Sequence, residues 1–164
     1  MTAATDQLAG VIGAIETRIL ALLAAGLGTS WRIEPFPAEP EAFDLASAAH
    51  IALVHYTGSR YDRPEGLGGG GQVRRPVFAV HLYLRDLRGE GGSYRAIEDV
   101  RLALEGAPAV PGAGGVGLEI TRDELVEQSG GVWHWLVEVR ALVRAVPRPT
   151  PPRVTTFAGA GRLP

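Results

Sequence analysis

The stretch that most constrains the fold runs from Pro76 to Gly106, PVFAVHLYLRDLRGEGGSYRAIEDVRLALEG. Every second residue from Phe78 to Leu84 is apolar, which predicts a strand over residues 77–84 with one buried face. After a charged turn, Ser93 is predicted to cap a helix of about three turns, with Ile97, Val100, Arg101 and Leu104 on one side. The chain therefore contains a strand, a loop and a helix in succession, whose apolar faces need a common core.

The segments before this unit indicate another helix and two further strands. Residues from about 5 to 25 are predicted to form a helix, capped by Thr5 or Asp6 and ended by Gly26 and Gly28. Its apolar stripe consists of Leu8, Val11, Ile12, Ile15, Ile19, Leu22 and Leu23. Residues 31–36 are expected to form an edge strand, because prolines follow it. Residues 50–56 are apolar on both alternations, which suits a central strand.

A hairpin is predicted near the end of the structured region. Residues 117–127 are expected to pair with residues 132–143 across Ser129, Gly130 and Gly131. The first arm loses its alternation between Ile120 and Leu125, which indicates a bulge. Trp133 and Trp135 share one face of the second arm, and we interpret them as core anchors.

These elements predict an α+β fold with a single domain over residues 1–146. We expect a mainly antiparallel sheet with two helices packed on one face. Residues 57–75 are expected to form a long loop around four consecutive glycines, Gly68 to Gly71. Residues 147–164 are rich in proline and are expected to form an extended C-terminal arm, in which Val154 and Phe157 are apolar residues suited to docking on a neighbour.

Composition excludes several classes of protein. The chain has 164 residues, a length suited to one domain, and its net charge of −2 argues against a protein that mainly grips nucleic acid. It contains no cysteine, which removes disulfides and thiolate chemistry, and every basic residue is arginine. The N-terminal apolar segment lacks a basic start and is interrupted by Glu16 and Arg18. We therefore expect neither a signal peptide nor a membrane span, and assembly in the cytoplasm.

No catalytic, cofactor or metal site is expected. The four histidines, His50, His55, His81 and His134, all fall on predicted strands, and His50 and His55 point to opposite faces. Strand histidines at solvent or subunit faces are therefore favoured over a metal pair. No serine, histidine and acid fall together in a motif, so catalysis is not expected.

Two charged segments remain as candidate contact sites. The glycine run lacks the Gly-Lys-Ser/Thr of a phosphate-binding loop. Its flanking arginines, Arg60, Arg63, Arg74 and Arg75, suit either contacts with phosphates or acidic partners, or a solvated segment. The turn with Arg85, Asp86, Arg88 and Glu90 suits a charged cleft beside a helix N-terminus, a salt-bridged turn or an intersubunit contact.

The chain resembles the Mu-like prophage Gp37 family of phage tail proteins over roughly residues 8–144. The resemblance is carried by ETRILALL, IALVHYTGSR, FAVHLYLRDLRGEGGSY and GVWHWLVEV. The glycine-rich insertion and the proline-rich tail depart from the pattern expected of the family. The resemblance implies a structural role at the head-proximal end of a contractile tail, as a tail terminator or completion protein. Similar terminators form rings, usually of six copies, that stop growth of the tail tube.

On this resemblance, the expected partners are further copies of the chain, the tail tube protein, the tail sheath protein and the neck or head–tail connector proteins. DNA would only pass through the lumen of the ring. The alternative is a connector or completion protein that does not control tail length. The residues expected at subunit or tube contacts are Arg85, Asp86, Arg88, Glu90, Tyr94, Arg60, Arg63, Arg74, Arg75 and Phe157.

Overall fold

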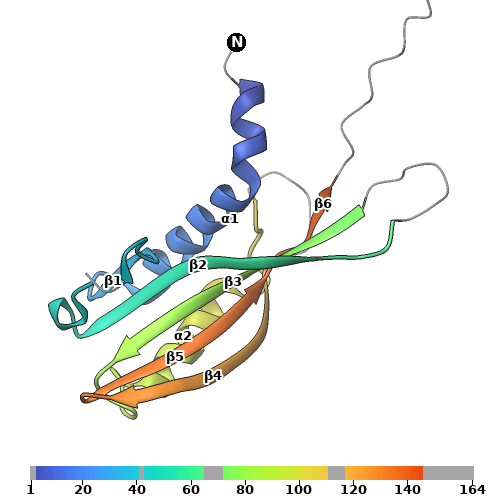
Figure 1. The fold of residues 1–164 in the computed structure, drawn as a ribbon. Helices are drawn as coiled ribbons and strands as arrows, with labels where there is room; N and C mark the ends of the chain where they lie inside the picture. The colour runs from blue at the N-terminus through green and yellow to red at the C-terminus, as the bar shows by residue number, and fades with distance from the viewer. Residues whose placement is uncertain (1–2, 41–42, 65–71, 111–116, 146–164) are drawn as a thin grey trace, which may run out of the picture.

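A computed structural model describes residues 3–40, 43–64, 72–110 and 117–145, and within these ranges it describes the side chains of residues 10–143. Two α-helices and six strands make up the domain (Figure 1). They are α1 (Ala3–Leu27), β1 (Trp31–Pro35), β2 (His50–Tyr61), β3 (Gln72–Leu84), α2 (Ser93–Leu104), β4 (Glu119–Ser129), β5 (Val132–Arg140) and β6 (Val143–Ala145), and a 3-10 turn, Leu45–Ser47, precedes β2.

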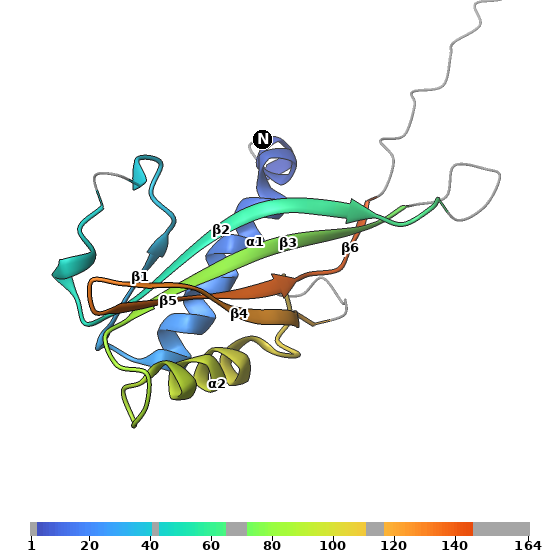
Figure 2. The same cartoon turned by 60° about the horizontal axis from the view of Figure 1, so that its bottom comes forward.

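The strands form one mixed sheet in the order β1-β2-β3-β5-β4, with β6 paired to β3. The β1–β2 pair is parallel, whereas β2–β3, β3–β5, β3–β6 and β4–β5 are antiparallel. Figure 2 shows both helices on the same side of the sheet. The predicted α+β class, with a mainly antiparallel sheet and two helices on one face, is confirmed.

The core lies between the helices and the face of the sheet that carries the alternating residues of β3. Phe78, Val80, Leu82 and Leu84 are all buried there, as their alternation predicts. They meet Ile15, Ile19 and Leu23 of α1, Ala96, Val100 and Leu104 of α2, and Val137 and Val139 of β5. We call this side of the sheet the helix face and the opposite side the open face.

The start and the buried side of α2 differ from the prediction. Gly92, not Ser93, is the N-cap. The buried Ser93 side chain instead donates a hydrogen bond to the Asp86 carbonyl, at 3.0 Å. A Cβ on Gly92 would lie 2.5 Å from the Arg88 carbonyl oxygen, so a glycine is required there. Arg101 lies at the surface, where it pairs with Glu98 and Glu105 on the same helix.

Helix α1 begins at Ala3, so Thr5 and Asp6 lie inside it and neither caps it. It ends at Leu27, and Gly28 follows with φ of 80°, a conformation that favours glycine. The segment Gly10–Leu27 is long and apolar enough to cross a membrane by length and composition alone. This is weak evidence for a span, because Ile15, Ile19 and Leu23 pack into the core as the buried residues of a core helix do.

The predicted loop over residues 57–75 is wrong in its extent, because β2 continues to Tyr61 and β3 begins at Gln72. Together the two strands project beyond the helices (Figure 1). We call residues 57–64 and 72–77 the arm. Backbone pairing continues along it, from Gly58 with Val77 to Tyr61 with Arg74. The four glycines at its tip and the proline-rich tail lie outside the described residues.

The β4–β5 hairpin is confirmed. Gly130 and Gly131 form its turn with φ of 57° and 75°. The register of β4 shifts between Ile120 and Arg122, which confirms the expected bulge, and again between Leu125 and Glu127. The second strand of the hairpin was predicted to run to residue 143, but it is interrupted after Arg140. The Ala141 N–H donates to the Pro76 carbonyl, and proline has no N–H to donate in return.

The helices approach closely at Gly26, and this contact makes a stability prediction. A Cβ on Gly26 would lie 2.6 Å from the Ala103 Cβ on α2. Gly26→Ala should therefore lower the free energy of unfolding by about 1–3 kcal/mol, despite the better helix propensity of alanine. Ala103→Gly should recover part of that loss in the double variant, which denaturant unfolding measures.

Gly13→Ala is the matched control, because no atom lies within 4 Å of a Cβ added there. This control should stabilise the protein by up to about 1 kcal/mol. Equal effects of Gly26→Ala and Gly13→Ala would contradict the close helix–helix contact.

Candidate assembly surfaces at the ends and edge of the sheet

The first candidate surface is the loop that joins β3 to α2, residues 85–92. Its backbone is fixed at its end, where the Ser93 N–H donates to the Asp86 carbonyl and the Tyr94 N–H donates to the Leu87 carbonyl. On its other side, the His50 ring donates from Nε2 to the Gly91 carbonyl at 3.1 Å. The loop is therefore held in a defined shape by backbone contacts, and its side chains are left for other contacts.

The charged side chains of this loop all lie exposed: Arg85, Asp86, Arg88 and Glu90. None of them forms an ion pair within the part of the chain that the structure describes, so the salt-bridged turn is wrong. The Arg88 guanidinium lies over the Tyr94 ring at 5.9 Å, and Tyr94 is half exposed and edge-on to Trp135. An aromatic ring with an arginine above it suits a contact with another protein.

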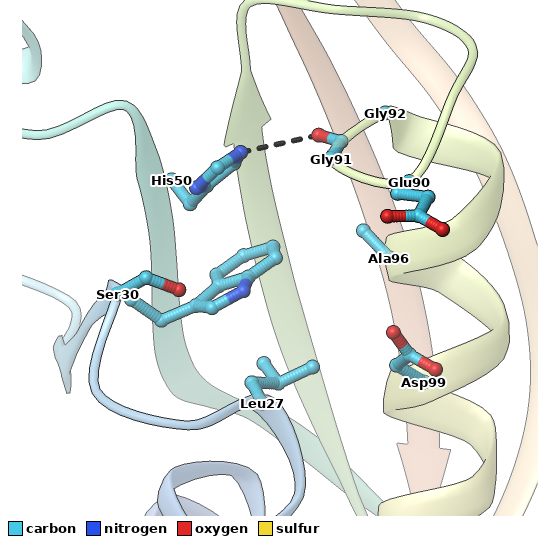
Figure 3. A pocket seen from close by; sticks show the side chains of 9 residues that line it. Leu27, Ser30, His50, Glu90, Gly91, Gly92, Ala96 and Asp99 are labelled. Atoms are coloured by element: carbon cyan, nitrogen blue, oxygen red, sulfur yellow. Dashed lines mark hydrogen bonds between the residues drawn. The ribbon is translucent and has the colours of Figure 1, made fainter.

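A small cavity of about 170 Å³ lies beside this loop (Figure 3). Trp31 stacks on His50 there, at 5.2 Å between ring centroids. Glu90, which precedes α2, and Asp99, in the second turn of α2, also line the cavity. These two carboxylates would repel an anion near the N-terminus of α2, so the cavity does not support the interpretation of the loop as a charged cleft.

The second candidate surface is the arm, where the four predicted arginines divide into two pairs. Arg75 pairs with Asp62 at 2.8 Å, and this ion pair lowers the pKa of the Asp62 carboxyl. Arg74 donates to Ser59 and Tyr56 and lies 5.7 Å from the Tyr61 ring centroid. These two arginines brace the arm.

The other two arginines, Arg60 and Arg63, are exposed, and neither forms an ion pair with a described carboxylate. Arg60 lies directly across from Arg75 in the β2–β3 register, so these two arginines lie on the open face of the arm, whereas Arg74 lies on the opposite face. Tyr61 is 54% exposed on the opposite face of the arm. Arg60 and Arg63 therefore do not brace the arm, and their exposed side chains are available for contacts with a partner.

The structure places the predicted contact residues at two opposite ends of β2 and β3. Arg85, Asp86, Arg88, Glu90 and Tyr94 follow the last residue of β3, whereas Arg60, Arg63, Arg74 and Arg75 lie around its first residues. The two groups do not come together in one site. Phe157 lies outside the described residues.

A third surface, the free edge at β4, was not identified from the sequence. Among the residues that the structure describes, β4 pairs with β5 alone, and ten of its eleven residues are exposed. It carries Glu119, Asp123, Glu124 and Glu127 against one arginine, Arg122. Leu125 and Val126 are 45% and 48% exposed. The sequence pattern of charged and apolar residues in this strand did not predict that both of its faces would be exposed.

Three histidines form a row on the open face, across β2, β3 and β5. The His55 and His81 rings stack at 5.1 Å, and His81 Nδ1 lies 2.8 Å from His134 Nε2. Phe36 covers the row, at 5.0 Å from both His55 and His81. Tyr83 stacks on His134 at 4.3 Å. We call His55, His81 and His134 the histidine row.

The position of the row differs from the prediction that strand histidines lie at solvent or subunit faces. His50 and His55 do lie on opposite faces, as predicted, since His50 contacts Gly91 and His55 contacts Phe36. Among the described residues, no group of three or more histidines, cysteines or acids has an arrangement that could hold a metal ion. The sequence alone could not predict the histidine row, because the row depends on the register between three strands and on the position of Phe36.

Burial disfavours the charged form of the whole row. The pKa of His81 is lowered to about 4, mainly by desolvation and in smaller part by the nearby His134 and His55. Desolvation also lowers the pKa values of His55 and His134, although Glu127 opposes this effect at His134. The hydrogen bond between His81 and His134 needs one lone pair, so a doubly protonated pair would lose it.

The row makes a pH prediction. Unfolded histidine binds its proton near pH 6.5, whereas folded His81 does so only near pH 4. The unfolded chain binds more protons between these values, so stability is full above pH 6.5 and falls as the pH drops towards 4. We expect a loss on the order of 2 kcal/mol, measured by denaturant unfolding at pH 7.5 and at pH 4.5.

His81→Phe should retain the packing and reduce this pH dependence. His50→Gln, on the helix face, is the control and should leave the pH dependence as it is in the original chain. An unchanged pH dependence in His81→Phe would show that the row does not resist protonation.

Comparisons with known proteins agree with the fold. A family model described as Gp37 protein matches residues 19–159. Among solved structures, a chain from a structure titled "Virion of native gene transfer agent (GTA) particle" superposes with a TM-score of 0.52 at 20% sequence identity. That match covers 83% of this chain and 98% of the other, and at this identity it establishes a shared fold. No curated protein matches the chain at a significant level.

Proposed function

Because the chain belongs to the Gp37 family, we propose that it is a structural protein of a contractile tail in a phage or phage-like particle. In this proposal, copies of the chain form a ring on the head-proximal end of the tail tube. The ring stops polymerisation of the tube and joins it to the neck and the sheath. The match of the family model over residues 19–159 carries the proposal.

The fold shared with a chain of a gene transfer agent virion supports this role. The surface of the domain also suits assembly, since β1 and β4 are the edge strands of the described sheet and the predicted contact residues lie at opposite ends of β2 and β3. A subunit with different surfaces at its two ends makes head-to-tail contacts, which close into a ring when the rotation between copies allows it. A ring that covers the end of a tube without offering another copy of that end stops its growth.

The partners in this proposal are further copies of the chain, which form the ring, and the proteins that meet at the tail end.

 The proteins that meet at the tail end are the tail tube protein, the tail sheath protein and the neck or connector proteins. DNA passes through the lumen of the ring. We assign the contacts to the 85–92 loop with Tyr94 and to the arm, because both present exposed arginines without a described ion-pair partner.

The alternative is a head–tail connector that joins the tail to the head without controlling tail length. The same fold and a ring of copies would serve that role. The two functions differ in what happens when the protein is missing, because only a terminator limits the growth of the tube.

Deletion of the gene in a host that produces the particles tests the proposal. Electron microscopy should show overlong or irregular tubes, and expression of the intact chain from a plasmid should restore the normal length. Tails of normal length that are not joined to heads would contradict the terminator and support the connector.

Replacing Arg85 and Arg88 with alanine tests the 85–92 loop. The variant should assemble into particles several-fold less efficiently, because two exposed cations are lost from the contact, while its circular dichroism and thermal unfolding stay unchanged. Arg95→Ala with Arg101→Ala, on the outer side of α2, is the matched control. Normal assembly of the loop variant would remove the loop from the interface.

A further inference from the structure

The arm and the β4 edge carry opposite charges. Among the described residues, the arm has Arg60, Arg63, Arg74 and Arg75 against Asp62 alone. Strand β4 has the reverse balance, with four carboxylates against Arg122. Arg75 pairs with Asp62 in the arm, which leaves three arginines in excess there. On β4, Glu119 pairs with Arg140 of β5 and Glu124 lies near Arg122, which leaves Asp123 and Glu127 in excess.

The two surfaces also match in their apolar residues. Tyr61 is exposed on the arm, and Leu125 and Val126 are exposed on β4. Tyr61 lies on the face of the arm opposite Arg60, and Leu125 lies on the face of β4 opposite Glu124 and Glu127. A contact between the two surfaces can therefore bury apolar residues on one face, which adds stability, and pair charges on the other, which adds specificity.

The backbone of β4 is open to a partner as well. The strand uses one side to pair with β5, and no other described strand pairs with its second side. Bulges at two places and a row of carboxylates discourage an uncharged strand from adding to this edge. A partner that carries arginines meets those carboxylates favourably.

The arm extends away from β4 of its own chain (Figures 1 and 2). A contact between the two surfaces therefore has to join different copies. We propose that the arm of one copy docks on the β4 edge of the next copy, in a head-to-tail contact that repeats around the ring. This inference deepens the proposed function, because it names the contact between subunits on which the ring rests.

Charge reversal tests the contact. The arm variant is Arg60→Glu with Arg63→Glu, and the edge variant is Glu124→Arg with Glu127→Arg; all four side chains are exposed. Each variant alone should weaken self-association by about tenfold or more, measured by light scattering of the purified protein at low salt. Raising the salt concentration should weaken association of the original chain too, because exposed charges are screened.

Mutual rescue is the decisive outcome. A chain that carries both reversals should associate again, and an equimolar mixture of the two single variants should form mixed oligomers. Arg95→Glu with Arg101→Glu on α2 is the control for net charge and should leave association unchanged. Reversals that weaken association without rescuing one another would overturn the contact.

Cysteine crosslinking provides a second measurement, since the chain has no cysteine of its own. A variant with Tyr61→Cys and Val126→Cys should give a ladder of disulfide-linked multimers on oxidation. Leu102→Cys with Val126→Cys should not, because Leu102 lies on the exposed side of α2. A monomeric original chain at low salt and high concentration, together with no ladder, would also overturn the proposal.

These results are separable from the test of function. Overlong tubes on gene deletion, without mutual rescue, would leave the terminator standing and remove this contact. Mutual rescue with tails of normal length would keep the contact and remove the terminator.

Discussion

The fold depends on the pairing of β3 with strands on both of its sides. It hydrogen-bonds β2 along one side and β5 and β6 along the other, and its alternate residues from Phe78 to Leu84 form the centre of the core. The helices pack on the face that these residues create. The arm, the 85–92 loop and the histidine row all take their positions from this one strand.

Different parts of β3 serve the stability of the domain and its candidate contact surfaces. Its middle is buried against α1 and α2, whereas its two ends lead into the arm and into the 85–92 loop. The charged residues of the 85–92 loop and Arg60 and Arg63 of the arm are exposed, so changes there affect the core little. This division lets a small domain keep a stable body while it presents different surfaces to different neighbours.

On the open face, histidine side chains are buried at the expense of their charged form. Ile51 and Leu53 are buried there although no helix covers them, and Phe36, in the connection between β1 and β2, packs over the adjacent histidines. The neutral histidines fill this layer as aromatic rings at neutral pH. The cost of the arrangement is sensitivity to acid, since a protonated ring cannot remain buried without a partner.

Local patterns predicted most elements of this fold. The alternation of β3, the paired glycines of the β4–β5 turn and the part of the α1 stripe from Ile12 to Leu23 each depend on neighbours in the sequence, and each is confirmed. Val11 was expected on the same stripe but is 40% exposed. The length of the arm was missed because the glycines and arginines there give no strand pattern. The N-cap at Gly92 depends on its contact with the Arg88 backbone, which sequence spacing does not reveal.

The candidate surfaces were predictable only in part. Exposed arginines in the arm and the 85–92 loop were expected from their position between elements. The acidic β4 edge and the histidine row depend on the order and register of strands far apart in the sequence, so no local pattern predicts them. For the same reason, the bracing roles of Arg74 and Arg75 became visible only from their contacts with Ser59 and Asp62.

The most direct test of the account is to locate the protein in purified particles by immunogold electron microscopy, with antibodies raised against the chain. The account predicts gold at the junction between tail and head, in every intact particle. Gold at the distal end of the tail or on the head shell, or particles without any label, would contradict the account.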